Sequence, residues 1–511
     1  MSHPSITEVK TPQSRCLFAL AWADITPPAG IYHRMWGAAW HDRASGVHRP
    51  LRASVAVFAS AVATHGDIET DEKTGAEKSA SSRRRVQGEA GQILLALDHC
   101  VLGAVEHEQL ISYVAEASGQ PKESILVVFS HTHAAGLMGL ERTSLPGGDL
   151  IPAYLRSVAE RATELVRECL TRLVPVGIVY GQGRCNLAGH RDFFDAERKQ
   201  FVCGFNPGGL ADDTVLVARV TDDRGNLLAT VVNYACHPTT LAWDNTLISP
   251  DYVGAMRDVV EQATGAPCLF LQGASGDLGP REGYGGDTAV ADRNGRQLGF
   301  AALSALTALP AAGTRFRYSG PVTSGAALGA WAYEALSAKE AKDKAMWQLW
   351  RWRERLPYRP GQPTPGEIEA ELRHFEATAE AARAAGDTRR ATEGRAMAER
   401  KRRLLHRLAQ LPRGEAFPLQ VVLWRMGDAF WLGVQGESYS LLQTELRRRF
   451  PDTPIVVASI AADWGASYLP PAHVYGTGIY QEMIAVVAAG SLEQLIDSIA
   501  TRITGQYVQA P

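Results

Sequence analysis

The stretch Ile125-Leu126-Val127-Val128-Phe129-Ser130-His131-Thr132-His133 joins a short apolar run to two histidines. The run is rich in β-branched residues and predicts a buried strand. Side chains two residues apart on an extended chain point to the same side, so we expect both imidazoles to leave the strand end together. An H-x-H pair alone is as typical of a surface or hydrogen-bonded pair as of a metal site.

A third histidine follows another apolar run. Leu227–Val232 predicts a second buried strand, and His237 comes shortly after it in Cys236-His237-Pro238-Thr239. Zinc hydrolases hold their metal with imidazole and carboxylate ligands, and such sites are most precise on rigid elements. Two clusters of histidine at strand ends therefore favour a metal site.

A carboxylate and a tyrosine occupy similar positions later in the chain. Glu437 follows the apolar run 430–434, and Tyr468 follows the run 455–460 after a short loop. A single Glu or Tyr in such a loop is usually solvated or hydrogen-bonded to its neighbours. The repeated placement after a strand makes both residues candidates for the same site.

The composition is that of a globular protein. The chain has 511 residues, of which 45% are hydrophobic and 21% charged, close to globular averages. This length suits two or three domains, or one α/β domain with an insertion. A net charge of -3 gives no reason to expect a nucleic-acid partner. Seven cysteines without a C-x-x-C pair favour a reducing compartment.

One segment near the start imitates a targeting signal. The apolar stretch Cys16–Ala23 follows Lys10 and Arg15, but it is short and runs directly into Asp24-Ile25-Thr26-Pro27-Pro28. We favour a first β-strand over a signal peptide, and hence a cytoplasmic location. No apolar run approaches the length of a membrane span.

Strand-like and helix-like segments alternate as far as about residue 320. Helical periodicity marks 152–173 and 252–263, whereas 51–63 and 92–102 could each be a strand or a helix. The turn residues Asp222–Asn226 between two apolar runs predict a hairpin. This alternation predicts an α/β fold with a layered mixed sheet.

The composition changes over residues 331–414, which are rich in Ala, Glu, Arg and Lys. Thr364-Pro365-Gly366-Glu367 is a capping box with proline at the first helical position, and Gly386-Asp387 is typical of one helix ending and another beginning. We predict a helical insertion over 331–414 in a catalytic domain formed by 1–330 and 415–511. Trp347, Trp350 and Leu356 are expected to pack it onto that domain, in preference to forming a lipid-facing stripe.

The motifs, taken in order, resemble those of the neutral/alkaline (non-lysosomal) ceramidases and their bacterial relatives. The resemblance covers most of the chain outside the insertion. The chain ends at Pro511, so the resemblance implies a relative lacking the family's immunoglobulin-like C-terminal domain. The matching segments are 23–28, Ser130–His133, Asn233–Thr239, Leu271–Asp277, Gly436-Glu437 and Tyr468–Pro471 with Tyr475 and Tyr480 behind it.

The resemblance implies a site and a reaction. It implies one zinc ion held by His131, His237, Glu437 and Tyr468, with His133 and an arginine that His190-Arg191 fits as further active-site residues. The implied reaction is hydrolysis of the amide of an N-acyl compound by zinc-bound water, as when ceramide yields a sphingoid base and a fatty acid in sphingolipid metabolism. His133 would protonate the leaving amine, and Arg191 and Tyr468 would stabilise the oxyanion.

Departures from the family leave the substrate open. Ceramidases commonly have a serine where this chain has Gly279, which excludes a serine nucleophile there, and no G-x-S-x-G elbow is present. Asp24 and Asp277 are expected either to tie down backbone N–H groups or to orient a zinc-bound histidine, and not to bind the metal themselves. A zinc amidohydrolase acting on a smaller soluble N-acyl or peptide-like amide remains an alternative. So does a non-enzymatic binding protein. The insertion carries none of the implied ligands and should influence substrate choice or assembly.

Overall fold

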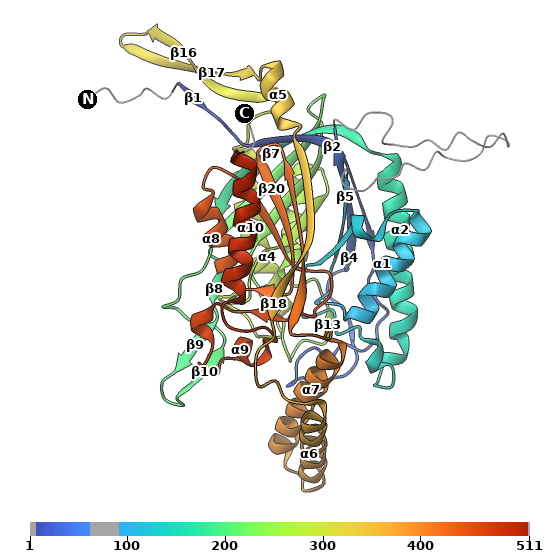
Figure 1. The fold of residues 1–511 in the computed structure, drawn as a ribbon. Helices are drawn as coiled ribbons and strands as arrows, with labels where there is room; N and C mark the ends of the chain where they lie inside the picture. Colours follow the sequence, from blue (N-terminus) through green and yellow to red (C-terminus); the bar gives the residue numbers. More distant parts are fainter. Residues whose placement is uncertain (1–6, 62–90, 509–511) are drawn as a thin grey trace, which may run out of the picture.

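A twelve-stranded mixed sheet forms the body of the protein (Figure 1), in a computed structural model that describes residues 7–61 and 91–508. Three neighbouring pairs are parallel, β5–β6, β12–β14 and β20–β22, and the other pairs are antiparallel. The predicted α/β fold with a mixed sheet is therefore confirmed. In sheet order the strands are β14 (Cys268–Gln272), β12 (Leu227–Tyr234), β11 (Thr214–Asp222), β7 (Val174–Arg184), β2 (Gln13–Asp24), β4 (Arg52–Ser60), β5 (Gly91–Leu97), β6 (Ile125–Phe129), β22 (Ile455–Ala461), β20 (Ala429–Gln435), β19 (Ala416–Met426) and β18 (Trp347–Pro357).

Both faces of this sheet are buried. Along β4, Val55 and Val57 belong to one apolar cluster, whereas Ala56 and Phe58 belong to another on the opposite face, as the period of two requires. The second cluster also takes residues from both ends of the strand order. The sheet therefore curls around a shared interior. Asn233 of β12 closes it with two hydrogen bonds to the backbone of Val457 in β22, at 2.8 and 3.1 Å.

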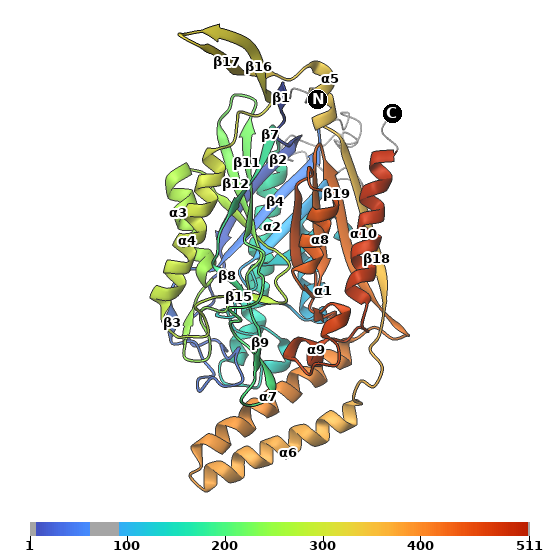
Figure 2. The ribbon, with the colours of Figure 1, turned by 90° about the vertical axis from the view of Figure 1, so that its left-hand side faces the viewer.

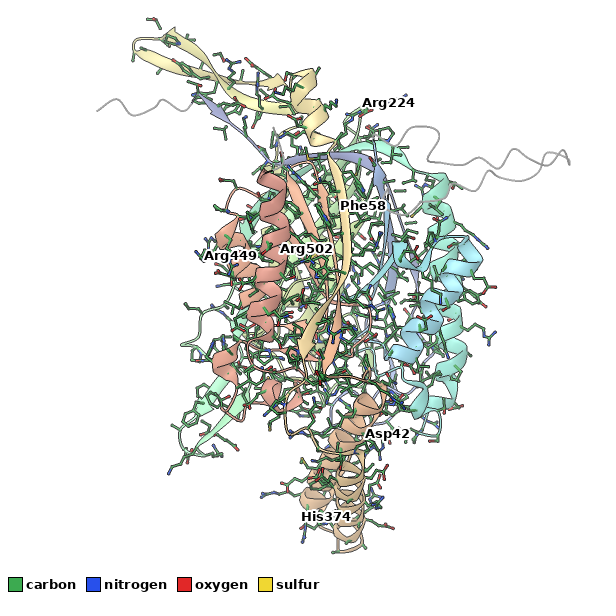
Figure 3. The ribbon with its side chains drawn as sticks, viewed as in Figure 1. Asp42, Phe58, Arg224, His374, Arg449 and Arg502 are labelled. Atoms are coloured by element: carbon green, nitrogen blue, oxygen red, sulfur yellow. The ribbon has the colours of Figure 1, made fainter. Side chains whose placement is uncertain are left out.

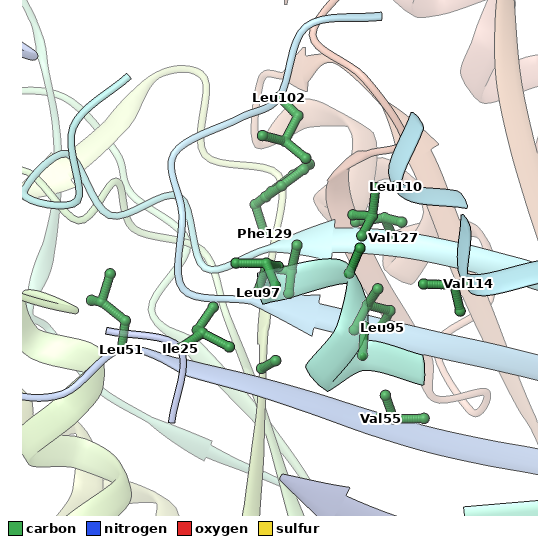
Figure 4. Close-up of a cluster of buried hydrophobic side chains, with 14 of the residues drawn as sticks. Ile25, Leu51, Val55, Leu95, Leu97, Leu102, Leu110, Val114, Val127 and Phe129 are labelled. Atoms are coloured by element: carbon green, nitrogen blue, oxygen red, sulfur yellow. The ribbon is translucent and has the colours of Figure 1, made fainter. Parts of the chain in front are cut away.

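Three helix pairs cover the outer faces of the curled sheet (Figure 2). Helices α1 (Ala104–Ser118) and α2 (Ile151–Thr171) bury the cluster shown in Figure 4, in which Leu95, Val114 and Val127 lie together. Helices α3 (Tyr252–Thr264) and α4 (Thr288–Thr307) cover β7, β11, β12 and β14, and α8 (Leu441–Arg449) and α10 (Ser491–Val508) cover β19, β20 and β22.

Most of the predicted elements are confirmed. The segments 152–173 and 252–263 are helices α2 and α3, and the two ambiguous segments contain strands β4 and β5. The segment that imitates a signal peptide, 16–23, lies within β2. Among the residues that the structure describes, no helix is long and apolar enough to cross a bilayer.

The range 331–414 differs from the prediction, because it is not entirely helical. It contains the end of β17 (Ala327–Ala335), the short helix α5 (Ala338–Lys344) and β18, which pairs with β19 along its whole length. The sequence pattern did not predict β18, because charged residues stand among the aromatic ones on this edge strand and lower its apolar character. Leu356 is fully buried, and Trp347 and Trp350 pack against the core, as expected for residues that join this segment to the body.

Helices α6 (Pro365–Ala384) and α7 (Thr388–Gln410) form the true helical hairpin and project from the body (Figures 1 and 2). The predicted capping box at Thr364 and the N-cap at Asp387 are both present. His374 of α6 and Asp42 of the body are labelled in Figure 3, and Asp42 lies at the junction, where Arg395 of α7 forms an ion pair with it.

Removal of the α6–α7 hairpin alone should leave a folded core. Pro357 and Ala416 are paired neighbours on β18 and β19, so a short glycine-containing turn in place of 360–413 would close a β-hairpin. We expect this variant to be soluble, to unfold cooperatively and to bind zinc. Deletion of 331–414 is the control: it strips β18 and should aggregate, because β19 becomes an exposed edge. Equal behaviour of the two variants in thermal unfolding would contradict this account.

Candidate metal centre and active site

Three candidate ligands come together from three strand ends. His131 lies two residues after β6, His237 three residues after β12, and Glu437 two residues after β20, in the short strand β21 (Glu437–Ser438). All three side chains are almost completely buried. They form a group whose ligand atoms lie close enough together to hold one metal ion.

Backbone carbonyls fix the orientation of both imidazoles. The Nδ1 atom of His131 is 2.8 Å from the carbonyl oxygen of Cys100, and Nδ1 of His237 is 2.7 Å from that of Ser275. A carbonyl oxygen can only accept a hydrogen bond, so Nδ1 carries the hydrogen in both rings. Each Nε2 is therefore the ring nitrogen that faces the centre of the group, where it offers a lone pair to a metal ion once it carries no proton, as in metal sites whose histidines are held by outer partners.

The three inward-facing atoms match the spacing of a small metal ion's ligands. The two Nε2 atoms are 3.1 Å apart, and Oε2 of Glu437 is 3.3 Å from His131 and 3.1 Å from His237. Ligands at about 2.0–2.1 Å in a tetrahedral shell lie about 3.3–3.4 Å from one another. Three lone-pair donors this close repel one another unless a proton or a metal ion lies between them. The donor set therefore fits a metal ion.

The surroundings act differently on the protonation of the three ligands. Burial would lower the pKa of His131, but Cys100 and Glu437 outweigh it and hold that pKa well above its ordinary value, so metal binding has to displace a proton from this imidazole. Burial, followed by the positive charge of Arg191, lowers the pKa of His237 to about 3, so this imidazole is neutral at neutral pH. Burial alone would raise the pKa of Glu437, but His131 and His237 outweigh it and hold that pKa well below its ordinary value. The second carboxylate oxygen, Oε1, accepts a hydrogen bond from Trp464 Nε1 at 2.8 Å.

Tyr468 and Arg191 lie at the edge of the three ligands. Tyr468 is in the short strand β23 (Tyr468–Leu469), which pairs with β21, and its hydroxyl is 3.4 Å from Nε2 of His237. Arg191 donates to this hydroxyl at 3.0 Å and to the carbonyl of Gly276 at 2.7 Å. The guanidinium is thereby held beside the candidate metal site, where it can stabilise negative charge.

His133 also reaches the group, although by a different path from the one predicted. Strand β6 ends at Phe129, and His131 has φ of +67°, a left-handed conformation. The extended-chain argument for this pair is therefore wrong. The two rings are nearly perpendicular, at 89°, yet their Nε2 atoms are 3.5 Å apart. A strained backbone at a non-glycine residue is typical of functional sites.

The two aspartates serve the backbone, as expected. Asp24 is exposed and accepts from the backbone N–H of Thr26 at 2.7 Å. Asp277 accepts from the N–H and the hydroxyl of Ser440, both at 2.6 Å. Within the described chain, neither carboxylate makes a hydrogen bond to His131 or His237. Gly279 lies near Arg191 in β15 (Leu278–Pro280) and offers no hydroxyl to the site.

A cavity of about 480 Å³ opens onto these residues, a volume within the usual range for small-molecule sites. One wall is aromatic, because Trp36 contacts Trp243 and Tyr284 with ring centroids 6.0 and 5.6 Å apart. His133 faces the cavity beside Trp36. Another wall of the cavity is charged. It is formed by helix α7, whose lining residues are Glu399, Arg400, Arg403 and Arg407.

Several residues of the site were not predicted from the sequence. The carbonyls that orient the histidines belong to Cys100 and Ser275, and a backbone group leaves no trace in the sequence. Trp464 lies four residues before Tyr468, but nothing in the sequence marks its indole as the partner of Glu437. The residues of α7 that line the cavity could have been found from their helical spacing. Ala396, Glu399, Arg400, Arg403 and Arg407 share one side of a helix at spacings of three and four.

Glu399 should make stability depend on pH in acid. Burial opposes its ionisation, but Arg403 and Arg142, with Arg34 behind them, outweigh burial and lower its pKa to about 2. Its stabilising contribution is therefore present above pH 4.5 and is lost as the pH falls toward 2, and its full size is about 3 kcal/mol. Zinc-free wild type and Glu399→Gln should differ in free energy of unfolding at pH 6, and this difference should shrink below pH 4. A difference independent of pH would contradict the assignment.

Comparisons with known proteins agree with this geometry at the level of the fold. No protein-family profile matches the sequence, and no curated protein matches it significantly. Among solved structures, neutral ceramidase from Pseudomonas aeruginosa matches with a TM-score of 0.61 and 16% identity, over 98% of this chain and 75% of that chain. A ceramidase complexed with C2 matches with a TM-score of 0.59 and 17% identity, over 97% of this chain and 76% of that one. The chain therefore has the fold of neutral ceramidase, as the resemblance of its motifs predicted.

Proposed function

We propose that the protein is a zinc-dependent amidohydrolase that cleaves the amide bond of an N-acyl compound. The observation that carries this proposal is the triangle of His131, His237 and Glu437, with all three sides between 3.1 and 3.3 Å, on the floor of a cavity. Two nitrogen donors and one oxygen donor in a tetrahedral arrangement suit zinc. Tyr468 is proposed as a further zinc ligand, beside the position that a catalytic zinc keeps for water.

When bound, zinc would supply a Lewis acid that polarises the substrate carbonyl and activates a water molecule. The chain's own residues then have separate tasks. Arg191, held against the Tyr468 hydroxyl, stabilises the negative charge that develops on the carbonyl oxygen. His133 accepts a proton from the attacking water and delivers it to the nitrogen as the C–N bond breaks. One water is consumed, and a carboxylic acid and an amine are released.

Ceramide is one N-acyl compound that would give these products, as a fatty acid and a sphingoid base. The structural matches to ceramidases support it as a substrate to test. The charged residues of α7 support the alternative of a smaller, water-soluble amide, because a neutral lipid has no group to pair with them.

An assay against a panel of N-acyl amides tests the proposal. Zinc-loaded protein is incubated with compounds from ceramides to short N-acyl amino acids, and released acid and amine are measured by mass spectrometry. Glu437→Gln is the control, since it keeps the shape of the side chain but removes the charge. Hydrolysis by the wild type alone is expected. If zinc-loaded wild type cleaves no member of the panel, the proposal is wrong.

A further inference from the structure

Helix α7 turns a cationic row toward the candidate active site. The row consists of Arg400, Arg403 and Arg407, which share one side of the helix at spacings of three and four residues. The helix belongs to the projecting hairpin in Figure 2, but its inner half closes the cavity that contains His133 and Glu437. This wall therefore faces any molecule that reaches the metal site.

Only part of this positive charge is neutralised within the protein. Glu399 accepts from Arg403 and Arg142 through Oε1 at 2.8 and 2.9 Å, and from Arg402 through Oε2 at 2.9 Å. One carboxylate thus serves three guanidinium groups, of which Arg142 and Arg402 also pair with Glu141 and Glu376, so Arg403 is the member of the row that Glu399 neutralises. In the described part of the chain, neither Arg400 nor Arg407 has a carboxylate within 4.0 Å.

Of these two residues, Arg407 has the greater need of an anionic partner, because it is only 5% exposed. It donates to the hydroxyl of Ser467 at 2.9 Å and lies over the ring of Trp464, while its Nε has no acceptor among the described residues. Burial lowers its pKa to about 10, which still leaves it charged at neutral pH. A buried cation with unused donors is costly unless a partner arrives.

Arg400 extends the same positive region along the wall of the cavity. Its side chain is half-buried, and its Nη2 meets only the sulfur of Met483, at 3.4 Å. Sulfur is a weak acceptor, so this guanidinium also retains free donors. Arg400 and Arg407 lie two turns apart on the same side of α7, and among the described residues neither has an anionic partner. Together they make this wall of the cavity positive, and a guanidinium matches a carboxylate in charge and in planar geometry.

The position of Arg407 places such an anion close to the reacting bond. Trp464 contacts Arg407 through its ring face and Glu437 through its N–H. One indole ring thus separates the guanidinium from a candidate metal ligand. A carboxylate on the carbon next to the amide nitrogen would match this short separation, and an acyl chain would lie along the aromatic wall at Trp36.

We propose that the substrates of this cavity are N-acyl amino acids, whose carboxylate binds to Arg407 and Arg400. This inference rests on the proposed function and narrows it to one substrate class. Hydrolysis adds one water across the amide: the acyl carbon gains oxygen, the nitrogen gains a proton, and a fatty acid and a free amino acid are released. The carboxylate is unchanged and serves only for recognition.

A matched pair of compounds tests the inference. N-Dodecanoylglycine carries the carboxylate, and N-dodecanoylglycinamide replaces it with a neutral amide while keeping the scissile bond. We expect zinc-loaded wild type to prefer the acid by about 10- to 100-fold in kcat/KM, the usual size of hydrogen bonds to charged groups. Arg400→Gln and Arg407→Gln should each lose most of this preference. Arg400→Gln should do so mainly through KM for the acid.

A charge-matched control and a binding measurement separate this inference from the proposed function. Arg389→Gln removes the same charge from an exposed position of α7 and should keep the wild-type preference; its side chain is 88% exposed. Calorimetry measures the affinity of both compounds for protein freed of metal with a chelator, and this measurement requires no turnover. If the acid binds more tightly but no amide is cleaved, the anion site stands and the proposed function fails. Equal binding of acid and amide by the wild type, or an unchanged preference in both arginine variants, would overturn the inference.

Discussion

His237→Ala is expected to lose most of the bound zinc and all measurable amide hydrolysis. The imidazole supplies one of three inward-facing donors, and its Nδ1 is fixed by the carbonyl of Ser275 at 2.7 Å. Without it, only His131, Glu437 and the Tyr468 hydroxyl remain, with a single imidazole, and this set is too weak to hold zinc through purification. Elemental analysis of the purified variant measures the loss.

The control for this prediction is a histidine outside the site. His374 lies on the projecting helix α6, far from the cavity (Figure 3). His374→Ala should retain one zinc per chain and wild-type turnover. Wild-type zinc content in His237→Ala would remove His237 from the ligand set.

His133→Ala is expected to keep its zinc but to lose turnover by about 100-fold or more, which is typical for the removal of a general acid–base group. His133 is not needed to complete the three-ligand group, but its Nε2 reaches to 3.5 Å from that of His131. Steady-state kinetics of the zinc-loaded variant measure the effect on the chemical step.

The leaving group distinguishes a proton-transfer role from a structural one. An N-acyl p-nitroanilide releases a weakly basic amine, which needs little protonation before it departs. His133→Ala should therefore lose much less turnover with this compound than with an alkyl amide. Equal losses on both substrates would indicate that His133 only shapes the site.

The candidate site could be predicted from the sequence because each ligand is marked by the residues next to it in the chain. A buried strand is visible as an apolar run, and a polar residue directly after it is held at a sheet edge. His131, His237 and Glu437 each satisfy this rule, and the structure brings them within 3.3 Å of one another. The helix starts at Thr364 and Asp387 were predictable for the same reason, since a cap depends on residues three positions apart.

Features that depend on distant neighbours were not predictable in this way. The left-handed backbone of His131 is stabilised by surrounding contacts, and its own residue type disfavours that conformation. β18 is a strand because β19 pairs with it, although charged residues between and after its tryptophans weaken its apolar pattern. The role of Arg407 emerges only when α7 folds back over Trp464, more than fifty residues along the chain.

The most direct test of the central claim is a zinc titration of activity. The protein is first freed of metal with a chelator, and amide hydrolysis is then followed as zinc is added back in known amounts. We predict no turnover in the metal-free protein and a linear recovery that ends at one zinc per chain. Full turnover by the chelated protein, or a zinc-loaded protein that never regains activity, would contradict a zinc-dependent hydrolase built on His131, His237 and Glu437.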